Sequence, residues 1–352
     1  MSYFVVLPGA LVPASIAVRL LARANIPRLS RRLPRAKVES IQPAPGERAP
    51  HLAWLWRRFG GVGDAPVTAP YAWRSLNRAS ATDVASEQPL WHADLVHFAF
   101  ARDHLLVASL EGEAAVTADE SRQLAEVAGS LAAEFNATLR VIDATHWFLS
   151  FDPPWNIVTV GLDAALGRSV EQVLPDGEAA ARWRKLLNEI QMHWHQHPVN
   201  AHREAEGRPA INGLWLHGGG IWQALPQRPF DAVATDDATV RGWALAAGVA
   251  PNALLEPDRV MQADGRIVLV YDKVLLHAAN HDDWDGWLEA LAPIDALYDA
   301  LCARAFANGH DGVTFVLSGR QHVRSVVVRP GDRWAFWRRR TIADLFAEPE
   351  TA

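Results

Sequence analysis

The chain has 352 residues, of which 49 % are hydrophobic and 21 % are charged, and this composition excludes a disordered chain. Its length is sufficient to bury a sizeable core, as one large domain or two ordinary ones. The formal net charge of −6 argues against nucleic-acid binding over the whole surface. The single cysteine, Cys302, excludes an intramolecular disulfide framework and fits a reducing cytoplasm.

The N-terminal segment predicts a strand followed by a turn. Tyr3–Leu7 is a short apolar run of the kind found in buried parallel strands, and Pro8–Gly9 supplies the turn. The segment differs from an export signal because its basic residues follow the apolar run instead of preceding it. No apolar run has the length required to span a bilayer, so we expect a cytoplasmic protein with no membrane contact.

A basic segment follows the first strand. Arg19–Lys37 contains seven basic residues and no acidic one. A solvated helix and loop is the first interpretation of this run, and an arm that binds nucleic acid or a membrane surface is the alternative. Residues 51–61, HLAWLWRRFGG, have the spacing and the glycine stop of a short amphipathic helix. Residues 64–90, rich in Ala, Ser and Pro, predict an irregular crossing.

Residues 91–197 predict a separate α+β lobe. Their pattern contains both strands and helices, and Thr117 and Glu120 have the spacing of a capping box at the start of the first helix. The predicted strands are Leu95–Phe100, Leu105–Leu110, Leu139–Asp143 and Trp147–Phe151, and the predicted helices are Asp119–Phe135 and Ala179–His197.

The most informative segment is His197–Gly220, which reads HPVNAHREAEGRPAINGLWLHGGG. The proline after His197 closes the preceding helix, a polar connector follows, and Ile211–His217 predicts a strand that runs into three glycines. Consecutive glycines mark a backbone with positive φ or a close approach to another group. One interpretation is a tight turn packed against a neighbouring element, and the other is a loop whose amides face an anionic ligand.

After Gly220 the pattern changes to alternating strands and helices, which is typical of a parallel sheet. We therefore predict a main α/β domain built from residues 1–90 and 198–352, with the α+β lobe of residues 91–197 inserted into it. The predicted strands of this part are Phe230–Thr235, Ile267–Tyr271 and Gly312–Leu317, and the predicted helices are Thr239–Ala247 and Trp284–Ala305.

The His197–Gly220 segment resembles the one that characterises archaeal-type cofactor-independent phosphoglycerate mutases, which belong to the alkaline phosphatase superfamily. It resembles still more closely a bacterial family of Rpf-type regulatory proteins. From Trp91 onward most of the chain can be aligned with this pattern. The resemblance implies an alkaline-phosphatase-like layered α/β domain with a mostly parallel sheet and an inserted α+β lobe. It does not fix the function, because one fold supports many functions.

The resemblance also implies a reaction centre that this sequence retains only in part. Enzymes of the superfamily hold two divalent metals with Asp and His side chains at strand ends, and the two cations stabilise a phosphoryl group carried by Ser or Thr. Pro8 stands where the first strand of the mutases ends in a metal-binding Asp, and proline has no side-chain donor atom. Gln321 precedes His322 where the family has Asp-His, and Ser75 is a weak candidate nucleophile. We expect a metal centre that is largely lost.

One group of potential metal ligands remains. Asp272, His277 and His281 lie after the strand IVLVY, at a spacing similar to that of a His, Asp and His set in the family. Imidazole and carboxylate groups suit Zn or Mn, so a site for a single divalent metal is one hypothesis. A polar loop with solvated histidines is the other.

The remaining candidate ligand-binding residues belong to the long motif. They are His197, Asn200, Arg203, Gly218, Gly219 and Gly220. We expect His197 to hold the helix end beside Asn200 and Arg203. Arg203 has two interpretations, contact with an anionic ligand or pairing with Glu204 or Glu206 that anchors the loop.

The sequence therefore leaves three hypotheses about function. The first is a non-catalytic, phosphoglycerate-mutase-like protein with a regulatory or binding role, whose partner is an unknown protein or a small anionic ligand. The alternative is a metal-dependent phosphoryl-transfer enzyme with an altered site at Asp272, His277 and His281. The third is a nucleic-acid-binding regulator that uses Arg19–Lys37 and the arginines at 338–340.

Overall fold

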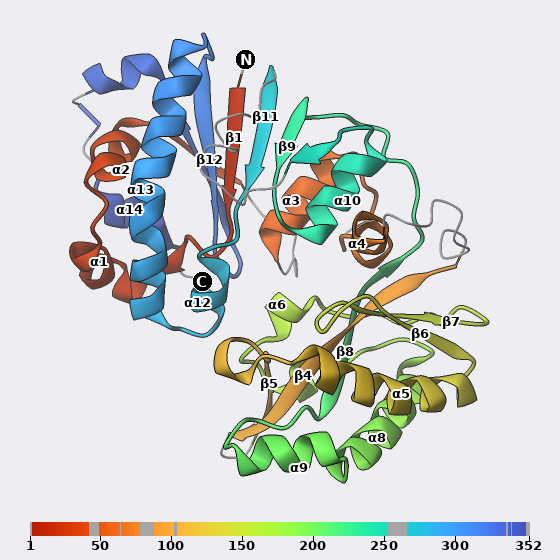
Figure 1. Ribbon diagram of the computed structural model, residues 1–352. Helices are drawn as coiled ribbons and strands as arrows, with labels where there is room; N and C mark the ends of the chain where they lie inside the picture. The colour runs from red at the N-terminus through yellow and green to blue at the C-terminus, as the bar shows by residue number, and fades with distance from the viewer. Residues whose placement is uncertain are drawn as a thin grey trace. The chain divides into compact units, whose positions relative to one another are not determined.

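The computed structural model describes residues 2–41, 49–63, 65–77, 88–101, 104–252, 266–335, 337–338 and 340–349. The chain divides into two compact units, the first formed by Met1–Pro66 and Ala224–Ala352 and the second by Val67–Gln223. The second unit is thus inserted into the first (Figure 1). The insertion is longer at both ends than the predicted limits of 91 and 197, because residues 213–220 form a strand that pairs with the strand beginning at Leu90.

The first unit is built on a seven-stranded, mostly parallel sheet, which confirms the predicted α/β class. The strand order is β10-β9-β11-β1-β12-β13-β3. Five neighbouring strands are parallel, and β13 and β3 add an antiparallel edge that the sequence did not predict. The strands are β1 (Ser2–Leu7), β3 (Lys37–Ile41), β9 (Ala232–Ala234), β10 (Pro251–Asn252), β11 (Ile267–Tyr271), β12 (Gly312–Ser318) and β13 (Val323–Val328).

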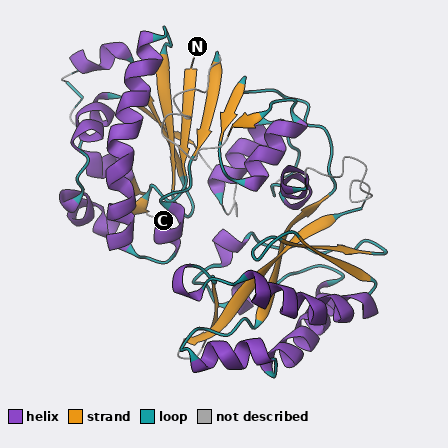
Figure 2. Ribbon diagram, viewed as in Figure 1, coloured by secondary structure: helices purple, strands orange, loops and turns teal. Residues whose placement is uncertain are grey.

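Helices cover both faces of this sheet (Figures 1 and 2). Alternate residues of β1 separate the two layers: Val5 and Leu7 join the core beneath α13, whereas Phe4 packs against Trp54 of α3 and against Phe230. The helices on the α13 side are α1 (Ala14–Arg23), α2 (Pro27–Arg32), α12 (Leu276–Asn280), α13 (Trp284–Ala307) and α14 (Ile342–Phe346), and those on the other side are α3 (Pro50–Arg58) and α10 (Ala238–Ala246).

The basic segment Arg19–Lys37 folds into α1, α2 and the start of β3, so the interpretation as a helix and loop is confirmed. Part of its charge is paired inside the unit: Arg23 contacts Asp285 and Arg32 contacts Asp299, each with 2.5 Å between nitrogen and oxygen. Both acids lie on α13. Nucleic-acid binding by this segment stays a prediction. Among the described helices, none combines the length and apolar character that a membrane crossing requires.

The second unit is an antiparallel α+β lobe. Its long strand β4 pairs with β5, β7 and β8, and β6 pairs with β7. The predicted capping box of Thr117 and Glu120 is confirmed at the start of α5. The strands are β4 (Leu90–Ala101), β5 (His104–Ala108), β6 (Ala137–Val141), β7 (Trp147–Phe151) and β8 (Gly213–Gly220). The helices are α4 (Ala69–Leu76), α5 (Ala118–Glu134), α6 (Leu162–Ala165), α7 (Val170–Val173), α8 (Ala180–His195) and α9 (Pro198–Ala205).

Two helices of this unit contradict the sequence analysis. Helix α4 forms where an irregular crossing was predicted, and α9 forms where a polar connector was predicted. Pro198 does end the preceding helix, but it also occupies the first turn of α9, where its missing N–H costs nothing. The proline therefore marks a helix boundary, but it does not distinguish a polar connector from a second helix.

Candidate functional site

The sequence places the candidate reaction centre at the carboxyl ends of the parallel strands in the first unit. Strands β1 and β11 are parallel, with Val6 opposite Tyr271. Pro8–Gly9 and Asp272 therefore lie at the same edge of the sheet, as expected. Two further side chains lie at this edge. Asp237 follows β9 and caps the start of α10, and Ser318 is the last residue of β12.

Asp272 is held by groups of the protein. The Tyr298 hydroxyl donates to its Oδ2 (2.6 Å) and the Val274 amide donates to its Oδ1 (3.0 Å). His277 of α12 and His281, which directly follows this helix, have ring centroids 4.4 Å apart. Among the residues that the structure describes, these two rings and Asp272 do not form a group of ligand atoms within 4.8 Å of one another. The structure brings the two histidines together but does not assemble the predicted metal set.

Asp237 lies beside a lysine at the same edge. Its Oδ1 accepts the Val240 amide at the start of α10 (2.9 Å), and its Oδ2 lies 3.3 Å from the Lys273 ammonium. Burial alone would raise the pKa of Asp237, but the positive charge of Lys273 and the Val240 hydrogen bond lower it below its usual value. The carboxylate is therefore ionised and already has a cation next to it.

Pro8 and Gln321, which the sequence resemblance aligned with metal ligands, have other surroundings in the structure. Pro8 offers no donor atom, and a methyl group on Gly9 would lie 2.7 Å from the backbone of α12, so this turn is packed against that helix. The backbone amides of Gln321 and His322 donate to the Glu348 carboxylate, at 2.7 and 3.0 Å. Among the described residues of this edge, Pro8 and Gln321 thus offer no carboxylate or imidazole ligand to a metal ion.

Sequence reasoning missed a buried pair at this edge. His51 of α3 and Ser318 of β12 are 3.2 Å apart through Nδ1 and Oγ, and both side chains are buried. Burial lowers the pKa of His51 to about 4, so its imidazole is neutral at pH 7. No local pattern marks this pair, because the two residues are separated by 267 positions in the sequence.

In the second unit, His197 and Asn200 shape the backbone around α9. The His197 Nδ1 accepts the Val199 amide (3.2 Å), which caps the start of α9 instead of the end of the preceding helix. The Asn200 amide group donates to the carbonyls of Trp194 and Ile211 (both 2.8 Å), and its oxygen accepts the Ile211 amide (2.7 Å). These contacts join the end of α8 to Ile211, just before strand β8.

Arg203 is fully buried and anchors the same region. Its guanidinium contacts Glu120 of α5 at 3.0 Å and donates to the carbonyls of Pro209 (2.8 Å) and Ala114 (2.5 Å). These contacts anchor the segment, and the carboxylate that pairs with Arg203 is Glu120 of α5, not the predicted Glu204 or Glu206. Anion binding by this group of residues stays a prediction.

The three glycines are part of strand β8, so the predicted turn is wrong. Gly218 and Gly219 oppose the single residue Trp91 of β4 in a bulge, and Gly218 has a φ of 62°. A methyl group on Gly218 would lie 1.8 Å from Thr68 Oγ1, and one on Gly219 would lie 1.9 Å from Trp91 Nε1. Close packing against these side chains explains the glycines.

Replacing Gly219 with alanine is expected to destabilise the second unit by about 1–3 kcal/mol, because the indole of Trp91 would have to move. The matched control is Gly129→Ala in α5, where a methyl group meets nothing within 4 Å and the helix gains about 0.5–1 kcal/mol. Urea unfolding of the two variants measures both effects. Equal stability of Gly219→Ala and the unmodified chain would contradict the packing explanation.

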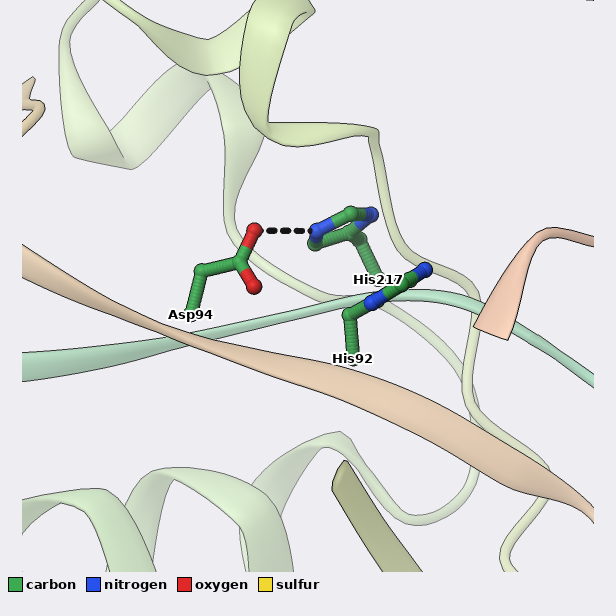
Figure 3. Close-up of side chains that lie close together, drawn as sticks. All are labelled: His92, Asp94 and His217. Atoms are coloured by element: carbon green, nitrogen blue, oxygen red, sulfur yellow. Dashed lines mark hydrogen bonds and ion pairs between the residues drawn. The ribbon is translucent and has the colours of Figure 1, made fainter. Parts of the chain in front are cut away.

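A second cluster of chemically active side chains lies in the sheet of the inserted unit. His92 and Asp94 are two residues apart on β4, and His217 of β8 is the direct cross-strand partner of His92. Figure 3 shows all three side chains on one face of these two strands. The two imidazoles are stacked, with centroids 4.7 Å apart and planes at 17°, and His217 Nε2 lies 2.7 Å from Asp94 Oδ2.

The cluster lies on the face of the sheet that is turned away from α5. Trp147 of β7 donates to Ser121 of α5, whereas the adjacent residue Phe148 faces the other way and is the cross-strand partner of His92. The Phe148 ring contacts Trp73 of α4, with centroids 5.3 Å apart. A helix and an aromatic ring thus border the cluster on this face.

The charges of the cluster favour an ionised carboxylate. Burial alone would raise the pKa of Asp94, but His217, through its charge and hydrogen bond, lowers it, and His92 and His146 add to this effect. Only 23 % of the Asp94 side chain and 14 % of the His217 side chain are exposed. His92, Asp94 and His217 each offer one ligand atom, and these atoms all lie within 4.8 Å of one another.

Sequence analysis missed this cluster because it began the strand at Leu95. With β4 beginning at Leu90, the motif His-Ala-Asp at 92–94 places two polar side chains on one face of an otherwise apolar strand. That spacing is a local signal. The contribution of His217 is not local, since it depends on the pairing of two strands separated by more than 100 residues.

No protein-family model matches the sequence, and no curated protein matches it. Solved structures are similar to it, including the following two. The PH0037 protein from Pyrococcus horikoshii is 15 % identical, with a TM-score of 0.52 over 94 % of this chain and 87 % of that one. A cofactor-independent phosphoglycerate mutase from Thermoplasma acidophilum is 15 % identical, with a TM-score of 0.39 over 94 % of this chain and 90 % of that one. The similarity to PH0037 shows a shared fold.

Proposed function

We propose that this chain is a non-catalytic protein of the mutase-like kind, with a regulatory or binding role such as the Rpf-type resemblance implies. Its partner in this proposal is a small anionic ligand or another protein. In this proposal the carboxyl-terminal edge of the parallel sheet keeps its fold but no longer holds two catalytic metal ions.

The observation that carries this proposal is the Lys273–Asp237 pair, 3.3 Å apart at the carboxyl ends of the parallel strands. A two-metal centre needs carboxylates that are available to dications, and repulsion between like charges disfavours such ions beside a lysine ammonium. The second carboxylate of the edge, Asp272, already accepts two hydrogen bonds. Together with Pro8, these contacts of the described residues argue against the donor set that phosphoryl transfer by two metals requires.

The purified chain is expected to show no interconversion of 2- and 3-phosphoglycerate, with or without added Mn²⁺ or Zn²⁺, in an assay where an authentic mutase is active. The variants Asp272→Asn and His281→Gln serve as controls for contaminating activity. Turnover that is abolished by a chelator and by either substitution would show that the altered site is catalytic, and the proposal would then be wrong.

The two alternatives have weaker support from the geometry. Phosphoryl transfer centred on Asp272, His277 and His281 would need these side chains to share an ion, and the described geometry does not group them. Nucleic-acid binding by the basic segment would have to use a surface where Arg23 and Arg32 already contact acids of α13.

A further inference from the structure

We propose that His92, Asp94 and His217 form a binding site for one divalent transition-metal ion, and that zinc is the ion that fits it best. This inference concerns the inserted unit alone. It does not depend on the proposed function, which concerns the sheet edge of the first unit.

The three side chains come from two rigid, directly paired strands. His92 and His217 are opposite each other in the β4–β8 ladder, and Asp94 is the next residue on the same face. Their ligand atoms lie within 4.8 Å of one another. Ligands bonded to a tetrahedral zinc at about 2.0–2.1 Å are about 3.4 Å apart. Small side-chain rotations, without a change in the backbone, are therefore sufficient to bring all three onto one ion.

The chemical nature of the donors selects the class of metal. Two imidazole nitrogens and one carboxylate oxygen suit Zn²⁺, Co²⁺ and related ions. Mg²⁺ and Ca²⁺ prefer sites made of oxygen atoms and are disfavoured here. Three protein ligands also leave the fourth position of a tetrahedral ion open for water or a small ligand, as in catalytic zinc sites.

The charge distribution is suitable for a cation. Asp94 is the acidic residue of the set and supplies the negative charge that a bound cation needs. His217 Nε2 and Asp94 Oδ2 lie 2.7 Å apart and form a hydrogen bond, so one shared proton links them. A metal ion would take the place of that proton and bridge the same two atoms. His92, stacked on the His217 ring at 4.7 Å, supplies the third ligand.

Surrounding groups restrict how these side chains can move. Phe148 packs against His92 with centroids 5.1 Å apart, and Trp215, the neighbour of His217 on the same face of β8, donates its indole N–H to the Val160 carbonyl (2.9 Å). His92 is only 8 % exposed. Such packing limits the rotamers that the ligands can adopt.

The test is a titration of the metal-free, full-length chain with Co²⁺ and Zn²⁺. We expect one ion per chain, a visible cobalt spectrum of nitrogen and oxygen ligands without a thiolate band, and displacement of cobalt by zinc. Mg²⁺ at the same concentration should not displace cobalt. The spectrum is measured on the unmodified chain, so it tests the site without any variant that might fail to fold.

Variants then locate the ion. Asp94→Asn and His217→Gln are each expected to weaken Zn²⁺ binding at least 100-fold, roughly, since even losing a group that only orients a ligand costs 10–100-fold. The matched control is the double variant His277→Gln/His281→Gln, which should bind within about twofold of the unmodified chain. Absence of saturable binding, or binding lost in the control and kept in Asp94→Asn, would overturn the proposal.

Discussion

Replacing Arg203 with methionine is expected to lower the free energy of unfolding of the second unit by about 3–5 kcal/mol. The guanidinium is fully buried and joins Glu120 to the carbonyls of Ala114 and Pro209. Methionine retains much of the volume but donates no hydrogen bond, so buried acceptors lose their partner. Arg203→Lys should recover only part of the loss, because one ammonium cannot reproduce the fork of a guanidinium.

The measurement is urea unfolding followed by peptide-resolved hydrogen exchange, which separates the two units. Arg122→Ala on the exposed side of α5 is the control and should change stability by less than about 0.5 kcal/mol, since its ion pairs with Asp119 and Glu126 are exposed. A small effect of Arg203→Met on stability, combined with loss of anion binding, would instead favour the role of Arg203 as a ligand-binding residue.

The stability of the first unit is expected to fall as the pH is lowered from about 6.5 to 4, because of His51. Burial lowers the pKa of this histidine from 6.5 to about 4 in the folded chain. In this pH range the unfolded chain binds a proton at His51 and the folded chain does not, so protons favour unfolding. The difference in pKa corresponds to a loss of about 3 kcal/mol once the pH is near 4.

Two variants isolate this effect. His51→Gln should remove this contribution to the pH dependence, so the stability of the variant should vary less than that of the unmodified chain between pH 6.5 and 4. Ser318→Ala removes the hydroxyl beside His51 but leaves the ring buried, and should therefore retain the pH dependence with a loss of about 1 kcal/mol throughout. An unchanged pH dependence in His51→Gln would rule out this histidine as its source.

The sequence predicted elements with a strong local signal and missed arrangements that depend on distant pairing. Strand β11 and strand β7 have the predicted limits, and the capping box at Thr117 is present, because apolar runs and capping residues act over a few positions. Strand β8 was predicted, but its pairing with β4 was not, since nothing local encodes a partner more than 100 residues away. For the same reason the limits of the inserted unit were placed too narrowly.

The same contrast between local signals and distant contacts applies to the candidate sites. The presence of Pro8–Gly9 and Asp272 at one sheet edge could be inferred, because parallel strands align their carboxyl ends. The engagement of Asp272 by Tyr298 could not, since it depends on how α13 packs over the sheet. Arg203 was expected to contact an anionic ligand or to pair with Glu204 or Glu206, and its carboxylate partner in the structure is Glu120 of α5. Side-chain partners are set by packing, which local patterns do not encode.

The position of β1 in the middle of the sheet determines the order in which the nascent chain can fold. This strand precedes the other strands of its sheet along the chain, yet it lies between β11 and β12, and Ser2 pairs with Ile267 and Gly312. At about 5–20 residues per second, β1 waits roughly 10–50 s for its first partner. The unit of residues 67–223 can complete its own sheet during that interval. An apolar strand without partners during synthesis is a natural target for chaperones, and slowing translation after residue 223 would lengthen its exposure.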